Sequence, residues 1–269
     1  MTRMRVCIKG AGELASAVAW RLFMANIRNI LMLEVPKPLA VRRGVSFCEA
    51  VYDGSQTVEG VEALRVHAGD MDSLSRTWDQ GKLAVAVDPH WEFQKLLHPD
   101  VVVDAILAKK NLGTSIPEAP LVIALGPGFE AGRDAHFVIE TNRGHDLGRV
   151  ITQGCASADT GIPGSVNGYT VERVLRAPVA GVFLPVRQIG DKVTRGEIVG
   201  RVEGVEITGQ IDGIVRGLIR PGARVSEGQK IGDIDPRGDA FLCTTISDKG
   251  RAVAGSVLEA IFRFHTRQG

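Results

Sequence analysis

The glycines near the amino terminus have the spacing of a dinucleotide-binding turn. Gly10 and Gly12 directly follow the apolar run at residues 5–9, and Ala15 takes the third small position of the pattern. Such a turn brings backbone N–H groups and a helix N-terminus against a pyrophosphate. Glu34 ends the next apolar run, 24 residues after Gly10, where a carboxylate accepts hydrogen bonds from ribose hydroxyls. These residues therefore predict a cofactor-binding site.

An alternative stays open at this turn. The glycines can serve packing alone within a strand–helix–strand unit, with Glu34 solvated. Glu13 directly follows the second glycine, so its negative charge must point away from any bound phosphate. The strand–helix–strand context favours the ligand-binding interpretation.

Arginines supply candidate anion-binding groups. Arg42 and Arg43 follow the second predicted strand and could hold a phosphate or carboxylate by forked hydrogen bonds, or form a solvated pair. Arg133 lies in a glycine-rich stretch at 126–151 that also carries several charged and imidazole side chains. These are Asp134, His136, Glu140, Arg143 and His145.

Polar and glycine-rich segments follow the later apolar runs at 83–88, 101–107 and 121–125. Asn111, Gly113 and Thr114 follow the second of these runs, and Gly126 and Gly128 follow the third. Ligands of open α/β sheets bind outside the carboxyl ends of the strands. The loops are therefore predicted to close around one ligand, although each alone is compatible with an ordinary turn.

These elements predict an α/β fold. The near-continuous apolar runs are typical of a parallel sheet buried on both faces, so residues 1–168 are expected to form a Rossmann-like domain that binds a nucleotide or cofactor. Residues 181–202 align on 213–234 at a constant offset of 32 residues, which predicts a repeated all-β module over 169–238. The remainder, 239–269, is predicted to be an extension with a helix at 250–265.

Composition narrows the class of protein. The chain has 269 residues and a net charge of +1, which disfavours a strongly basic nucleic-acid binder. No apolar run approaches the roughly 20 residues that span a bilayer. The four cysteines are scattered, so neither a disulfide scaffold nor a structural zinc site is expected, and the predicted location is the cytoplasm. Cys48 or Cys155 could be a reactive thiol, although a small buried side chain is the commoner role.

The repeated module resembles the biotinyl/lipoyl carrier fold, a barrel-sandwich hybrid. The segments APVAGV (177–182) and GDKVTRG (190–196) carry the resemblance. A carrier domain needs a lysine on the hairpin between its halves, and the sequence has no lysine between Lys192 and Lys230. Covalent biotin or lipoyl attachment is therefore rejected.

The whole set of motifs resembles an accessory protein family of the selenium-dependent molybdenum hydroxylase system. The motifs are the glycine turn, PLAVRRGVSFCEAVYDG, AKKNLGT, the block at 124–151, ADTGIPG and GDIDPRG. The resemblance implies a maturation role, with the molybdenum hydroxylase apo-enzyme and a selenium donor as partners. It implies no particular catalytic residue.

Three hypotheses follow. In the first, the protein holds a molybdopterin-type cofactor or its dinucleotide, with the pyrophosphate at residues 10–12 and anionic groups near Arg42, Arg43 and Arg133. In the second, it is an NAD(P)-dependent oxidoreductase of the same pathway, and Glu34 favours NAD because a carboxylate repels a 2′-phosphate. In the third, it is a non-enzymatic scaffold.

Overall fold

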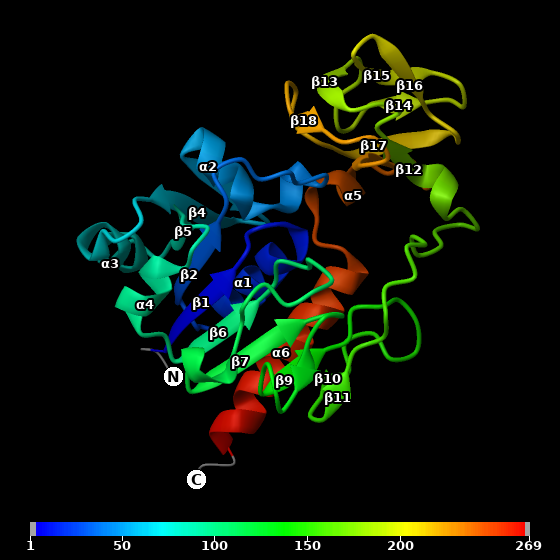
Figure 1. The fold of residues 1–269 in the computed structure, drawn as a ribbon. Coiled ribbons are helices and arrows are strands. Elements are labelled where there is room, and N and C mark those ends of the chain that lie inside the picture. Colours follow the sequence, from blue (N-terminus) through cyan, green and yellow to red (C-terminus); the bar gives the residue numbers. More distant parts are fainter. Residues whose placement is uncertain (1–3, 267–269) are drawn as a thin grey trace. The chain divides into compact units, whose positions relative to one another are not determined.

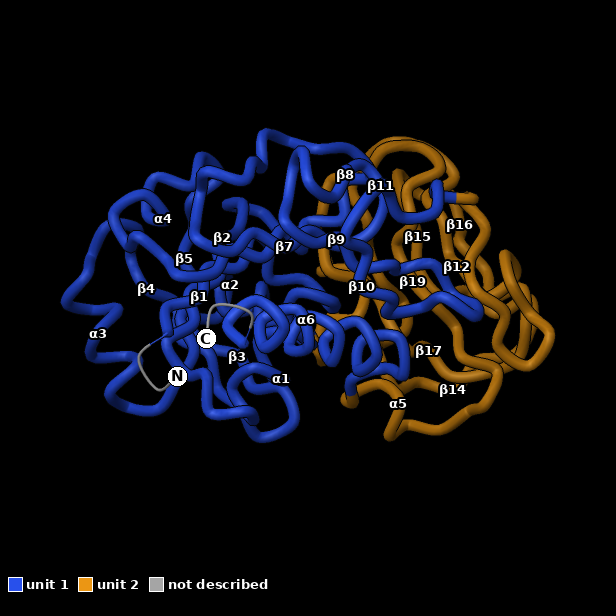
Figure 2. The backbone as a smooth tube through the Cα atoms, turned by 90° about the horizontal axis from the view of Figure 1, so that it is seen from below, with its two compact units in different colours: residues 1–38, 46–159, 246–269 blue, residues 39–45, 160–245 orange. Residues whose placement is uncertain are grey.

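The computed structural model describes residues 4–266. The chain divides into two compact units, drawn in different colours in Figure 2. Unit 1 comprises residues 1–38, 46–159 and 246–269, and unit 2 comprises residues 39–45 and 160–245. The predicted domain boundaries stay a prediction.

Unit 1 is built on a nine-stranded mixed sheet with the order β10-β9-β7-β6-β1-β2-β5-β4-β3 (Figure 1). Neighbouring strands from β9 to β4 run parallel, and β10 and β3 pair antiparallel at the two edges. The strands are β1 (Arg5–Lys9), β2 (Asn29–Glu34), β3 (Ser55–Val58), β4 (Val61–Val66), β5 (Leu83–Val87), β6 (Val101–Asp104), β7 (Leu121–Leu125), β9 (Phe137–Ile139) and β10 (Val150–Ile151). A separate two-stranded ribbon pairs β8 (Glu130–Ala131) with β11 (Gly154–Cys155).

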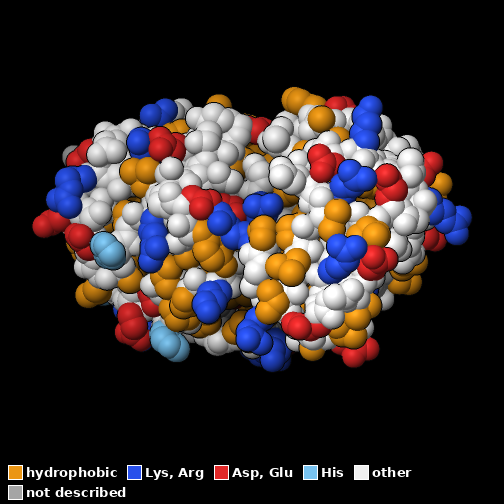
Figure 3. Space-filling model, turned by 90° about the horizontal axis from the view of Figure 1, so that it is seen from above, with side chains coloured by type: hydrophobic (Ala, Val, Ile, Leu, Met, Phe, Trp, Pro, Cys, Tyr) orange, Lys and Arg blue, Asp and Glu red, His pale blue; other side chains and the backbone are white. Residues whose placement is uncertain are grey.

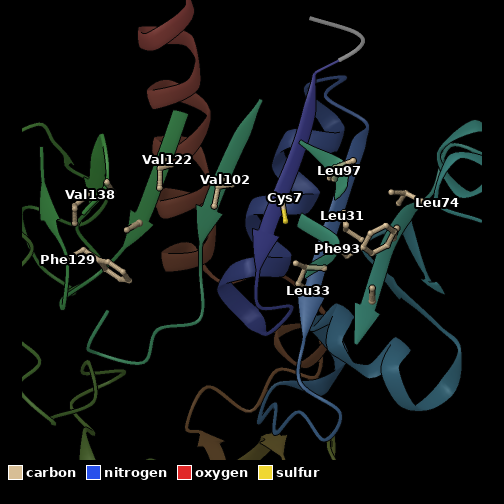
Figure 4. Close-up of a cluster of buried hydrophobic side chains, with 14 of the residues drawn as sticks. Cys7, Leu31, Leu33, Leu74, Phe93, Leu97, Val102, Val122, Phe129 and Val138 are labelled. Carbon is tan, nitrogen blue, oxygen red and sulfur yellow. The ribbon is translucent and has the colours of Figure 1, made fainter. Parts of the chain in front are cut away.

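Helices cover both faces of this sheet. They are α1 (Glu13–Met24), α2 (Ala50–Asp53), α3 (Met71–Asp79), α4 (Glu92–Leu97) and α6 (Asp248–Thr266), with 3-10 turns η2 (Phe47–Glu49) and η3 (Ile116–Glu118). The helices α1 and α6 lie side by side. Figure 4 shows the cluster on the other face, where Cys7, Leu31 and Val102 of the sheet lie in one buried layer with Phe93 of α4 and Leu74 of α3. Alternation along each strand sends every second side chain into this layer.

Unit 2 contains two four-stranded antiparallel sheets, with orders β12-β19-β17-β14 and β16-β15-β13-β18. The strands are β12 (Val174–Arg176), β13 (Gly181–Pro185), β14 (Lys192–Val193), β15 (Ile198–Val202), β16 (Val205–Thr208), β17 (Gly213–Leu218), β18 (Arg224–Val225) and β19 (Lys230–Asp235), and the short helices are η1 (Arg43–Val45), η4 (Val171–Arg173) and α5 (Phe241–Thr244). The 32-residue repeat is visible in the strand starts, because β13, β14 and β15 begin 32 residues before β17, β18 and β19. Each sheet takes two strands from each repeat, so the two repeats interlock around one core.

The predicted fold class requires correction. The structure does not show a Rossmann-like parallel sheet followed by a biotinyl/lipoyl-like barrel; it shows a large mixed sheet together with separate antiparallel sheets. One cause is the hairpin of β3 and β4. Its turn residues Glu59 and Gly60 have φ values of +43° and +80°, a two-residue turn that matches strand twist and adds an antiparallel edge.

No helix in the described range 4–266 is long and apolar enough to cross a membrane. Basic and acidic side chains are interspersed over the face of the molecule in Figure 3, in keeping with a net charge of +1.

Candidate functional site

The candidate site lies at the carboxyl ends of β1 and β6 in unit 1. The chain leaves β1 toward β2 on one side and later returns to place β6 on the other side, which makes this pair the point where the strand order reverses. Gly10 has a φ of +94°, and a Cβ there would lie 3.2 Å from the Ala105 carbonyl oxygen. The turns that follow β1 and β6 therefore approach so closely that Gly10 has to be glycine.

Gly12 forms the N-cap of α1 and faces open space. Its φ of −71° is accessible to any residue, and no heavy atom lies within 4 Å of the position that its Cβ would take. Within the described residues no side chain caps this helix. The first N–H groups of a helix have no intrahelical acceptor, so the turn offers donors and the positive end of the helix dipole.

Glu34 holds the glycine turn rather than standing solvated. Its Oε2 accepts a hydrogen bond from the Ala11 N–H at 2.8 Å, and its Oε1 accepts one from the Val35 N–H at 2.8 Å. Burial raises the pKa of this carboxyl above its ordinary value, although the two backbone hydrogen bonds oppose the shift. Glu13, whose charge would repel a phosphate, accepts a hydrogen bond from the Ser247 hydroxyl at 3.1 Å.

A buried ionic network lies beside this turn. The ammonium of Lys9 is fully buried, 2.6 Å from Glu118 Oε2 and 2.8 Å from Thr114 Oγ1. It also lies 3.8 Å from the centre of the Trp91 ring. A buried cation needs such partners because desolvation disfavours its charge. Lys9 therefore links the end of β1 to the segments that carry Trp91, Thr114 and Glu118.

Asp104 completes this network from the end of β6. Its Oδ2 accepts a hydrogen bond from the Thr114 hydroxyl at 2.7 Å, and its Oδ1 accepts one from the Ile106 N–H at 3.2 Å. The side chain is only 1% exposed. Burial raises the pKa of the Asp104 carboxyl; the Thr114 and Ile106 hydrogen bonds and the charge of Lys9 oppose that rise, and the charge of Glu118 adds to it. Titratable groups perturbed in this way are typical of functional sites.

The raised pKa of Asp104 predicts a sign for its effect on stability. A carboxyl whose folded pKa is raised contributes stability below its unfolded pKa, near 3.9, and loses that contribution as the pH rises through the folded pKa. We therefore expect Asp104→Asn to gain stability relative to wild type as the pH rises from about 4 to 7. Urea unfolding across this range measures the free energy of unfolding of the variant minus that of the wild type, and a difference that falls with rising pH contradicts the assignment.

The loop between β6 and η3 is held in strained conformations. Asn111 accepts hydrogen bonds on Oδ1 from the N–H groups of Gly113 and Thr114, at 2.8 and 2.7 Å. Leu107 and Lys109 have φ values of +62° and +61°, which are costly for residues with a side chain. This loop was predicted from the sequence as part of the site. In the structure Asn111 and Gly113 shape the loop, and the Thr114 hydroxyl is hydrogen-bonded within the ionic network.

Gly128 brings the next loop against this one, and Gly126 packs against the side chain of Thr141 after β9. A Cβ on Gly128 would lie 2.6 Å from the backbone N and Cα of Lys110, and a Cβ on Gly126 would lie 2.6 Å from Thr141 Oγ1. Both glycines have positive φ values, +106° and +78°. The loops after β6 and β7 are therefore packed backbone to backbone.

The three candidate arginines do not join this cluster. Arg42 and Arg43 belong to unit 2, where Arg42 donates to the carbonyls of Leu242 and Thr245 at 2.6 and 2.8 Å, and Arg43 donates to a backbone carbonyl at 2.8 Å. Arg133 is a surface residue, 2.6 Å from Glu130 and 3.2 Å from Asp134. Its hydrogen bond to Asp134 raises its pKa.

Four further candidate groups are two cysteines, a histidine and a glutamate. Cys48 is buried and its N–H donates to the Ala11 carbonyl at 2.8 Å. Cys155, expected as a small buried side chain, is exposed on β11. His136 accepts from the Val122 N–H, and burial lowers its pKa. Glu140 is 3% exposed; burial acts to raise its pKa, but hydrogen bonds from backbone N–H groups outweigh burial and lower it.

Sequence reasoning missed four members of the network: Lys9, Trp91, Asp104 and Glu118. The signal available for two of them was a charged residue inside an apolar run, since Lys9 ends RVCIK and Asp104 interrupts VVVDAIL. A charge at the carboxyl end of a buried strand is a candidate site residue.

Comparison with models of known protein families gives no match. The chain is 50% identical over 256 residues to the uncharacterized protein YqeB of Escherichia coli (strain K12), a match that covers 95% of this chain and 47% of that protein. The chain thus spans about half the length of this curated relative. Solved structures similar to it include an aspartoacylase family protein from Mesorhizobium loti MAFF303099 (13% identity, TM-score 0.25, 80% of this chain and 58% of that one). A succinylglutamate desuccinylase/aspartoacylase from Rhodobacter sphaeroides is similar at 14% identity and a TM-score of 0.25, over 76% and 57%. At these scores we transfer no activity from either structure.

These findings contradict the resemblance to the selenium-dependent molybdenum hydroxylase accessory family and the maturation function drawn from it. Solved structures similar to the chain include proteins named as aspartoacylases or succinylglutamate desuccinylases and an ectoine utilization protein, and the curated relative is uncharacterized. The resemblance rested on motifs whose residues have structural roles in this chain. Asn111 caps its own loop, and Gly126 and Gly128 allow neighbouring segments to pack closely against their backbone. The cofactor and partner predictions stay predictions.

Proposed function

We propose that unit 1 binds a phosphate-bearing small molecule of the dinucleotide class at the turn between β1 and α1. The observation that carries the proposal is Gly12, an N-cap with open space in place of a side chain. A pyrophosphate fits there because N–H groups at a helix start, together with the helix dipole, favour negative charge. This turn also lies at the point where the strand order reverses, the usual ligand position in open α/β sheets.

The surrounding residues support the same ligand class. Glu34 fixes the turn by accepting from the Ala11 N–H, which leaves the N–H groups at the start of α1 as the donors for phosphate. The buried Lys9–Thr114–Asp104 chain holds the neighbouring loop in place. The proposal includes a cytoplasmic location, a compartment in which scattered cysteines such as those of this chain stay reduced.

The proposal is tested by calorimetric titration with ADP-ribose and NAD, and with adenosine as a phosphate-free control. We expect Gly12→Glu to weaken the binding of both pyrophosphates by tenfold or more, because its carboxylate enters the space that the phosphates need. The fold is expected to survive, since the position has an ordinary φ and open surroundings.

Gly255→Glu is the matched control. Gly255 lies within α6, and a Cβ there also meets nothing within 4 Å, so the variant makes the same change of charge away from the turn. Equal affinities of the two variants for ADP-ribose and NAD, or no binding of either by the wild type, would reject the proposed site.

A further inference from the structure

Trp91 has a strained backbone conformation in the loop that follows β5. It forms the N-cap of α4 with a φ of +59°, a region that is costly for a residue with a bulky side chain. A glycine or an asparagine adopts this conformation at lower cost. Backbone strain of this kind persists only where the surrounding structure compensates for it, and it clusters at ligand-binding sites. The turn alone therefore does not account for a tryptophan at this position.

Lys9 covers one face of the Trp91 ring. The buried ammonium lies 3.8 Å from the ring centre, a cation–π contact that compensates part of the strain. At its edge the ring reaches Gly113, where a Cβ would lie 3.8 Å from Trp91 Cζ3. The side chain nevertheless stays partly exposed. The ring therefore joins the loops that follow β5 and β6, at the same end of the parallel strands as the glycine turn.

The indole N–H of Trp91 differs from those of the other two tryptophans. Trp20 donates to the Glu59 carbonyl at 3.3 Å, and Trp78 donates to the Ile30 carbonyl at 3.0 Å. The Trp91 N–H has no acceptor within the described part of the chain, and it is accessible to solvent. A tryptophan presents a large aromatic surface together with one donor. Trp91 therefore offers both to a ligand at this end of the sheet.

We propose that Trp91 is a specificity residue that stacks on the aromatic base of the phosphate-bearing ligand, an inference that rests on the proposed function. Lys9 directly precedes the glycine turn, so the ring that covers its ammonium lies beside the proposed phosphate position. A nucleotide joins its phosphate to its base through one sugar, so neighbouring residues can hold the two groups. Stacking on an aromatic side chain is a common way of holding a base, because every base has a π-face.

Fluorescence titration of the full chain with ADP-ribose tests whether the base contacts this ring. A base stacked on an indole quenches the emission of that indole. Trp78 is the matched control, since it is also partly exposed and packs against the same apolar cluster as Trp91. We expect ADP-ribose to quench the emission of the wild type and of Trp78→Leu, and to leave the emission of Trp91→Leu unchanged.

Calorimetric titration with ADP-ribose and with inorganic pyrophosphate separates the base from the phosphates. Trp91→Leu should weaken ADP-ribose binding at least about fivefold more than it weakens pyrophosphate binding, because pyrophosphate has no base to stack. Trp91→Phe keeps an aromatic ring and should recover part of this loss. Trp78→Leu should change the affinities for the two ligands by the same factor.

Two failures are distinguishable. If Trp91→Leu weakens the binding of both ligands equally, or if ADP-ribose still quenches its emission, the role of Trp91 is overturned while the phosphate site stands. If the wild type binds neither ligand, the inference is rejected together with the proposed function.

Discussion

Lys9→Met is expected to destabilise unit 1 by about 3–5 kcal/mol, because it leaves the buried Asp104 and the partly buried Glu118 without a cation. The Lys9 ammonium lies 2.6 Å from Glu118 Oε2 and donates to Thr114, which in turn donates to Asp104. Methionine keeps the apolar stem but removes the charge. Since folded domains are stable by only about 5–15 kcal/mol, the loss is a large part of the total. Tryptophan fluorescence during urea unfolding measures it, because all three tryptophans lie in unit 1.

Lys95→Met is the control for that experiment. Lys95 pairs with Glu92 at 2.7 Å, but both side chains are about two-thirds exposed, at 68% and 67%. An exposed pair contributes at most about 1 kcal/mol. The double variant Lys9→Met/Glu118→Gln should recover part of the loss, since it removes one of the stranded charges. A Lys9→Met variant no less stable than Lys95→Met would show that the network does not hold the site together.

Some features of the fold are encoded in short stretches of the sequence. The apolar runs at 83–88, 101–107 and 121–125 predict strands, and β5, β6 and β7 form within them, because a strand buried on both faces is encoded in consecutive apolar residues. The glycine turn follows equally from local spacing. The mixed character of the sheet cannot be predicted in this way. The antiparallel edge depends on a hairpin whose strands are short and partly polar, such as SQTV in β3.

Site residues were harder to predict wherever their partners are distant in sequence. Lys9 ends an apolar run and was given no role, because its partners Thr114 and Glu118 come more than 100 residues later. Arg42 reads as an anion clamp, whereas it donates to carbonyls about 200 residues away. Long side chains with several donors form hydrogen bonds to acceptors that the tertiary fold places near them. Those acceptors cannot be identified from a single sequence.

Gly128→Ala is expected to cost about 2–5 kcal/mol. The value combines about 1–2 kcal/mol for a side chain at positive φ with about 1–3 kcal/mol for overpacking. A Cβ at this position would lie 2.6 Å from the backbone N and Cα of Lys110, and a backbone cannot rotate away as the end of a flexible side chain can. The loop after β7 must then separate from the loop after β6, which carries the strained Lys109. Loosening this contact should also weaken ligand binding at the neighbouring turn.

Gly132→Ala separates the two contributions. Gly132 has a φ of +88°, comparable to the +106° of Gly128, but nothing lies within 4 Å of the position that its Cβ would take. Its cost should therefore be limited to the strain of positive φ, about 1–2 kcal/mol. The difference between the two variants, measured by tryptophan fluorescence in urea, reports the close approach of the two loops alone. If the two alanine variants are equally stable, the loops are free to separate. The packing of the loop after β7 against the loop after β6 then does not depend on Gly128.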